Sequence, residues 1–143
     1  MVGFPGETEA DVCELAEFMA AKRLDNVGIF CYSNEAECAA AQLTEQCPEE
    51  VKIARKDQLM QVQAEISREI NQRKVGTVEP VLVEGLSRES DLLLEGRTRY
   101  QAPEIDGVVY ITAGTCQVGE IVDVRITEAH PYDLVGEIVE AEE

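Results

Sequence analysis

The spacing of apolar residues changes near Gly76, and this change limits what the chain can fold into more than any other feature. Before Gly76, apolar residues recur every three or four positions, which is the period of one face of a helix. After Gly76 they alternate with polar residues in short runs separated by glycines, which is typical of β-strands. Since each period suits one kind of element, the sequence predicts an α/β part over residues 1–74 and an all-β part over residues 75–143.

The first part is interpreted as a glycine loop, a helix, a buried strand and a second helix. Thr8 and Asp11 resemble a capping box, worth about 1 kcal/mol, at the start of a helix that runs to about Leu24. Residues 27–32 form a near-continuous apolar run, as expected for a parallel strand covered on both faces. A long second helix is predicted to begin near Pro48. The stripes that should face the core are Val12, Leu15, Ala16 and Met19 in the first helix, and Leu59, Val62, Ile66 and Ile70 in the second.

The second part contains five short strand candidates and no helical pattern. The clearest is residues 121–126, where Val122, Val124 and Ile126 alternate with polar residues. Five short strands within such a length predict a small closed barrel of the OB type. The candidates are residues 81–83, 92–94, 108–111, 121–126 and 134–139.

The chain is strongly acidic. It has 29 acidic and 12 basic residues, for a net charge of −17, and residues 75–143 carry 15 acids, four arginines and no lysine. Such a surface repels nucleic acid, because affinity for phosphates depends on Lys and Arg side chains that displace counterions. It attracts a basic protein instead. The alternative reading is that the acidity serves solubility.

The five cysteines and the single histidine form no recognisable metal or catalytic set. Cys31, Cys38 and Cys47 match no common ligand spacing, so we expect reduced thiols and no metal site. His130 lies in a loop, and no catalytic residue is assigned. No run approaches the length of a membrane span, and the first residues lack the features of a signal peptide. We therefore expect a cytoplasmic monomer without membrane contact.

The segment GFPGET has the character of a ligand-binding loop. Gly3 and Gly6 would let the backbone approach a ligand, and Pro5 would stiffen the turn. The helix that follows offers unpaired N–H groups at its first turn. The alternative is a plain strand-to-helix turn without a ligand.

Several motifs in the same order resemble a known family. They are GFPGETEADV, DNVGIFCYS, PEEVKIARKDQLMQVQAEIS, GRTRYQAPEIDGVVYI and YDLVGEIVE. Together they resemble the C-terminal part of the radical-SAM methylthiotransferases, and APEIDG favours the RimO type, which modifies an aspartate of a small-subunit ribosomal protein. The resemblance covers essentially the whole chain.

The resemblance implies a fold, cofactors and a partner. Residues 1–74 would be the last part of a radical-SAM partial (β/α) barrel, and residues 75–143 a TRAM β-barrel that receives the protein substrate. The family uses S-adenosylmethionine and [4Fe–4S] clusters to place a methylthio group on an aspartate β-carbon. The cysteines that hold these clusters are absent from this sequence. We therefore expect a piece of a longer enzyme that is inactive alone, with a basic ribosomal protein as partner and no tRNA.

The resemblance also assigns candidate residues. The loop would lie against S-adenosylmethionine, and the next strand would contribute. The segment after Ser33 departs from the family at Ala36, Glu37 and Cys38, so that loop should differ in shape. The cofactor candidates are Gly3, Phe4, Pro5, Gly6, Glu7, Phe30, Tyr32 and Ser33.

Residues 97–106 are the candidate contact surface for the ribosomal protein. Arg97 and Arg99 are two of only four positive side chains in the second part, and the alternative is that they pair locally with carboxylates. The candidates are Arg97, Arg99, Tyr100, Glu104 and Asp106. Two other functions stay open: a stand-alone acidic module that binds a basic protein, and a piece of a tRNA-modifying methylthiotransferase.

Overall fold

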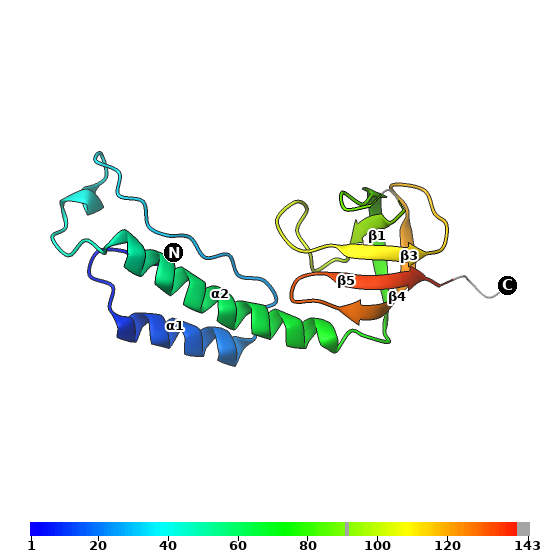
Figure 1. Cartoon of the computed structure of the whole chain (residues 1–143), viewed down its shortest axis with the longest axis horizontal. Coiled ribbons are helices and arrows are strands. Elements are labelled where there is room, and N and C mark those ends of the chain that lie inside the picture. The colour runs from blue at the N-terminus through cyan, green and yellow to red at the C-terminus, as the bar shows by residue number, and fades with distance from the viewer. Residues whose placement is uncertain (91, 140–143) are drawn as a thin grey trace. The chain divides into compact units, whose positions relative to one another are not determined.

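The chain forms two helices followed by five strands. In this computed structural model, residues 1–90 and 92–139 are described. The helices are α1 (Glu9–Lys22) and α2 (Glu49–Gln72), with a 3₁₀ turn at Ala39–Gln42 between them (Figure 1). The strands are β1 (Val78–Leu86), β2 (Leu94–Arg97), β3 (Val109–Ala113), β4 (Ile121–Ala129) and β5 (Leu134–Ile138). The chain divides into two compact units, Met1–Ile66 and Ser67–Glu143, so the division falls inside α2.

The cap predicted for α1 is confirmed. The Asp11 amide donates to the Thr8 hydroxyl oxygen at 3.3 Å, and the Thr8 amide donates to the Asp11 carboxylate at 2.8 Å. The helix ends at Arg23, whose left-handed φ of 51° lets its amide donate to the Met19 carbonyl. Val12 and Met19 are buried, as the predicted stripe requires.

The buried face of α2 combines apolar and polar side chains. Leu59 and Ile66 are buried, as predicted, but Lys52, Arg55 and Gln63 are buried on the same side of the helix. Arg55 contacts the start of α1 and Gln63 contacts the residues just after its end, so the two helices run in the same direction (Figure 1).

The strand predicted at residues 27–32 is wrong, since only an isolated bridge forms there, between Val2 and Cys31, and the predicted burial on both faces is wrong as well. The Val2 amide donates to the Phe30 carbonyl, and the Tyr32 amide donates to the Val2 carbonyl, both at 2.8 Å. This bridge is parallel, as predicted. Ile29 and Tyr32 are buried, whereas Phe30 is 72% exposed. An apolar run is covered on both faces only where neighbouring elements exist, and within the described part of the chain only Val2 bridges to this segment.

The five strands close into a barrel, as predicted. Their order is β1-β2-β3-β5-β4, in which β3 and β5 pair in parallel and the other neighbours pair antiparallel. Three of the five pairings contain a register shift, and such irregularities bend strands so that a sheet can close. Closure leaves no free sheet edge. The alternating residues fill its core, which consists of Val81, Val83, Val109, Ile111, Val124, Ile126 and Leu134.

The second strand lies later than residues 92–94, where the sequence placed it. β2 begins at Leu94, and Leu92 is 91% exposed in the preceding turn. The Glu89 and Leu92 amides donate to the hydroxyls of Ser87 and Ser90, respectively. Serine side chains that accept from nearby amides favour turns over strands.

No helix among residues 1–90 and 92–139 combines the length and apolar character needed to cross a bilayer.

Candidate functional site

Most of the candidate residues belong to two regions: the loop at residues 3–7 in the first unit, and a pocket on the barrel in the second. In the loop, Gly3 and Gly6 have left-handed φ angles of 78° and 85°, which favour glycine. A Cβ at Gly3 would lie 2.2 Å from Cγ of Lys52, and one at Gly6 would lie 3.2 Å from the Glu45 carboxylate. These two glycines therefore allow close packing inside the unit.

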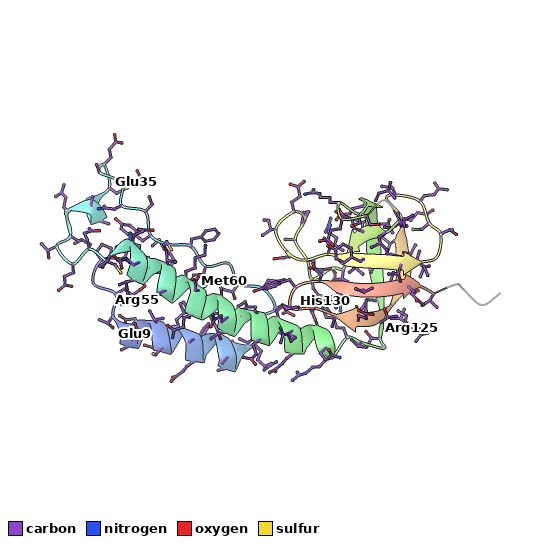
Figure 2. The ribbon with its side chains drawn as sticks, viewed as in Figure 1. Glu9, Glu35, Arg55, Met60, Arg125 and His130 are labelled. Atoms are coloured by element: carbon purple, nitrogen blue, oxygen red, sulfur yellow. The ribbon has the colours of Figure 1, made fainter. Side chains whose placement is uncertain are left out.

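Glu7 closes the loop on itself. Its Oε1 accepts the Gly3 amide at 2.8 Å, and the same oxygen accepts Nη1 of Arg55 at 2.8 Å. Arg55 also lies 3.7 Å from the carboxylate of Glu9 at the start of α1 (Figure 2). Pro5 is buried. The loop is thus fixed by ion pairs from α2.

The aromatic candidates differ in how much surface they offer. Phe4 is 40% exposed and makes an edge contact with Tyr32, with 5.3 Å between ring centroids. Tyr32 is buried, and Phe30 is the most exposed of the three. Ser33 donates its hydroxyl to the Glu35 carboxylate at 2.7 Å. Phe4 and Phe30 are therefore the candidates with free ring surface.

An open pocket of about 460 Å³ lies beside this loop. Its lining includes Gly6, Glu7 and Thr8 together with Arg55 and Cys47. Nη1 of Arg55 lies 3.8 Å from the sulfur of Cys47. Gly3, Phe4, Pro5 and the candidates on residues 30–33 do not line this pocket.

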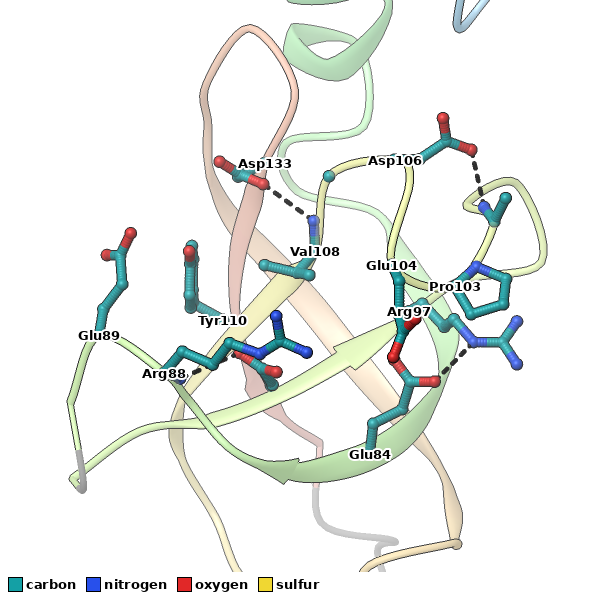
Figure 3. Close-up of a pocket in the computed structure, with 13 residues that line it drawn as sticks. Glu84, Arg88, Glu89, Arg97, Pro103, Glu104, Asp106, Val108, Tyr110 and Asp133 are labelled. Carbon is teal, nitrogen blue, oxygen red and sulfur yellow. Dashed lines mark hydrogen bonds and ion pairs between the residues drawn. The ribbon is translucent and has the colours of Figure 1, made fainter.

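A second pocket, of about 290 Å³, opens on the barrel (Figure 3). It contains two arginines. Arg97 donates Nε to the Glu84 carboxylate at 2.8 Å, so its charge is paired locally, while the Arg88 amide donates to Glu95 at 3.3 Å. The six carboxylates of the pocket belong to Glu84, Glu89, Glu95, Glu104, Asp106 and Asp133.

The APEIDG segment forms one rim of this pocket in a well-defined conformation. The Ala102 amide donates to the Asp106 carboxylate at 2.7 Å, and Glu104 has a left-handed φ of 63°. A Cβ at Gly107 would lie 2.0 Å from the Tyr132 carbonyl oxygen, so only glycine fits there without movement. The next residue, Val108, donates its amide to Asp133 at 2.9 Å.

Tyr110 from β3 lies among these acidic side chains. Burial raises the pKa of its phenol, and the negative charges of Asp133, Glu89 and Glu95 raise it further. At neutral pH the pocket therefore combines a neutral aromatic ring with carboxylates. A long cationic side chain suits both, because its alkyl stem packs on the ring while its charge meets the carboxylates.

The structure brings together only some of the predicted contact residues. Arg97, Glu104 and Asp106 line the barrel pocket, whereas Arg99 and Tyr100 do not. Tyr100 lies instead beneath two cations: Nζ of Lys74 is 4.6 Å from its ring centroid, and Arg99 is 4.8 Å from it. Arg99 also donates a hydrogen bond to the Tyr100 hydroxyl.

Four residues that contact or line these two regions were not singled out from the sequence. Lys52 and Arg55 precede Leu59 at helical spacing, so a helical wheel extended to charged residues would have placed them on the buried face. Tyr110 and Asp133 come together because β3 pairs with β5, and no local pattern announces that pairing. No group of three or more His, Cys, Asp or Glu side chains among the described residues is arranged to hold a metal ion.

The barrel matches a known family. Residues 75–139 match the family model of the TRAM domain, and the closed five-stranded barrel is consistent with a TRAM barrel. Over nearly its whole length the chain is also similar to proteins named ribosomal protein uS12 methylthiotransferase RimO. It is 51% identical to the one from Desulfotalea psychrophila over 142 residues, which cover 99% of this chain and 32% of that protein. It is 50% identical to the one from Bdellovibrio bacteriovorus over 139 residues, which cover 97% of this chain and 30% of that protein.

The chain thus spans about a third of the length of the curated relatives it matches. The predicted resemblance to RimO-type methylthiotransferases is confirmed by this similarity.

Proposed function

We propose that this chain is the C-terminal third of a ribosomal-protein methylthiotransferase and that its TRAM barrel binds the protein substrate. The similarity to the RimO proteins supports the reaction, in which a methylthio group is placed on the β-carbon of an aspartate of uS12. In this proposal residues 1–74 belong to the radical-SAM domain and residues 75–143 to the barrel domain.

The observation that carries the substrate-binding role is the acidic pocket on the barrel. Six carboxylates face two arginines there, and Arg97 is already paired with Glu84. The barrel part has a net charge of −11, so a basic ribosomal protein would be attracted over distances up to the Debye length, about 8 Å at physiological salt. A lysine or arginine of the partner would then lie over Tyr110, with Glu104 and Asp106 at the rim.

For S-adenosylmethionine, the loop at residues 3–7 is the proposed contact. The exposed rings of Phe4 and Phe30 fit the apolar part of such a ligand, whereas the sides of Gly3 and Gly6 are occupied by Lys52 and Glu45. The cofactor would supply the carbon radical and the methyl group of the family reaction. The described residues include no group of side chains suited to hold an iron–sulfur cluster.

The test is a titration of the full chain with ribosomal protein uS12 and, separately, with tRNA at matched ionic strength. We expect uS12 to bind with an association rate that falls steeply as salt is added, and tRNA to bind weakly. The pocket variant Glu104→Gln, which removes one charge, should weaken uS12 binding by roughly 3- to 10-fold. Glu65→Gln on α2 removes one charge outside the pocket and should leave binding within about twofold.

Tighter binding of tRNA than of uS12 would refute this assignment and would move the chain to the tRNA-modifying relatives. Equal losses in Glu65→Gln and in the pocket variant would mean that total charge, and not the pocket, selects the partner.

A further inference from the structure

The first half of α2 buries two positive charges. Lys52 is only 5% exposed and Arg55 only 9%. Long cationic side chains are seldom so buried unless they are paired, because removing a charge from water costs more than packing returns. Both residues donate hydrogen bonds to the segments that carry the cofactor candidates, and they also form ion pairs with Glu49 and Glu9.

Lys52 joins α2 to both segments at once. Its Nζ donates to the Tyr32 carbonyl at 3.0 Å and to the Glu49 carboxylate at 3.0 Å, and it lies 5.4 Å from the centroid of the Tyr32 ring. Its alkyl stem fills the space beside Gly3 where a Cβ would stand. The position of Lys52 therefore fixes how closely the loop and residue 32 approach the helix.

Arg55 acts on the loop through Glu7. Its Nη1 donates to the Glu7 carbonyl at 3.2 Å and to Glu7 Oε1 at 2.8 Å. That oxygen also accepts the Gly3 amide, so one carboxylate oxygen receives donors from both the helix and the start of the loop. If Arg55 loses its charge, Glu7 becomes a half-buried carboxylate without its cation, and water will compete for it.

We infer that Lys52 and Arg55 are positioning residues that hold the loop at residues 3–7 in its binding conformation, with Glu7 as the link. Glu7 would then serve mainly to lock the loop through Oε1. The inference rests on the proposed function only for the identity of the ligand, since the contacts that define the loop lie within the chain itself.

The first measurement is amide hydrogen exchange by NMR on the full chain, with no ligand. In Arg55→Gln the Gly3 amide should exchange about 10- to 100-fold faster, the factor that corresponds to loss of a hydrogen bond to a charged group. Amides of β4 such as Val124 should be unchanged. Arg55→Lys keeps the charge and should restore part of the protection. Lys52→Met should also speed exchange at Gly3, whereas Lys56→Met, a matched loss of charge on the same helix, should not.

The second measurement is the dissociation constant of the full chain for S-adenosylmethionine by calorimetry. If the wild type binds S-adenosylmethionine, Arg55→Gln should weaken this binding by about 10- to 100-fold, which is the usual effect of removing a residue that orients a ligand-contacting group. Leu59→Ala, which destabilises the same helix without touching the loop, should keep the affinity at temperatures well below unfolding.

The outcomes separate the two proposals. Absence of binding by the wild type would overturn the cofactor assignment, while exchange at Gly3 would still decide the positioning role. Unchanged Gly3 exchange in Arg55→Gln, or equal acceleration at Gly3 and Val124, would refute the positioning role.

Discussion

Replacement of Gly107 by alanine tests the geometry of the barrel pocket most directly. The added Cβ would lie 2.0 Å from the Tyr132 carbonyl oxygen and 2.5 Å from its carbon, where ordinary contact begins at 3.4 Å. The loop or the β4–β5 hairpin must therefore retreat by more than about 1 Å, because neither obstructing atom belongs to a movable side chain. The same movement would stretch the 2.9 Å hydrogen bond from the Val108 amide to Asp133.

The cost follows from these two contributions. Overpacking against backbone costs about 1–3 kcal/mol, and a hydrogen bond to a charged group contributes about 1.5–3 kcal/mol. Since one movement of the backbone both relieves the overpacking and stretches the hydrogen bond, the two costs do not add in full. We expect the free energy of unfolding to fall by about 2–4 kcal/mol. For a unit of this size, that lowers the midpoint of thermal unfolding by at least about 10 °C. Because Gly107, Val108 and Asp133 all line the pocket, affinity for uS12 should fall as well.

The assay is urea and thermal unfolding of the full chain followed by circular dichroism, with Gly119→Ala as the control. Gly119 has a left-handed φ of 90° and no atom within 4 Å of its missing Cβ, so alanine there costs only the backbone term, about 1–2 kcal/mol. Partner affinity should survive in that variant. A Gly107→Ala protein within about 0.5 kcal/mol of wild type would refute the close approach of Tyr132 on which the pocket geometry depends.

Three further predictions concern titratable groups. The backbone and hydroxyl hydrogen bonds from Thr8 lower the pKa of Asp11, so its ionised form stabilises the fold above about pH 4, and that contribution is lost as the pH falls further. Asp11→Asn should flatten this part of the acid unfolding curve. A variant curve identical to that of the wild type would contradict the cap. Because the pKa of Tyr110 is raised, an ultraviolet titration that compares the wild type with Tyr110→Phe should show this phenol ionising above pH 10. Stability should be lost as the pH rises through the pKa of Tyr110 in the folded protein. Ionisation at or below pH 10 would be inconsistent with its burial. Burial and the charge of Glu120 raise the pKa of the Cys116 thiol. This thiol should therefore react with a disulfide reagent at pH 8 more slowly than the exposed thiol of Cys38. Equal reaction rates would count against the burial of Cys116.

Much of the local structure could be predicted because it depends on neighbours in the sequence. The capping box needs only Thr8 and Asp11, three positions apart, and the barrel core needs only alternation along each strand. The second strand was misplaced because the hydroxyls of Ser87 and Ser90 accept hydrogen bonds from backbone amides and so form a turn. A search for alternating apolar residues does not detect hydrogen bonds of this kind. The burial of residues 27–32 was overestimated because the apolar character of a segment does not tell which elements cover it.

The candidate site was only partly predictable. Glu104 and Asp106 stand close in the sequence and both line the pocket, whereas the Tyr100 ring contacts Arg99 and Lys74 and neither Arg99 nor Tyr100 lines the pocket. Which side chains of a loop face a pocket depends on backbone angles such as the left-handed φ of Glu104, which the order of residue types along the loop does not specify.

By itself, the sequence determined the two kinds of structure, the helix cap, the number of strands in the second part, the acidic charge and the family resemblance, because each of these depends on composition or on short spacings. Only the tertiary structure decided that Lys52 and Arg55 of α2 hold the glycine loop, and that Tyr110 and Asp133 complete an acidic pocket. Arg55 and Glu7 are 48 positions apart, and Val108 and Asp133 are 25 apart. Contacts over such separations exist only after helices and strands have packed, since nothing local in the chain selects one partner from many.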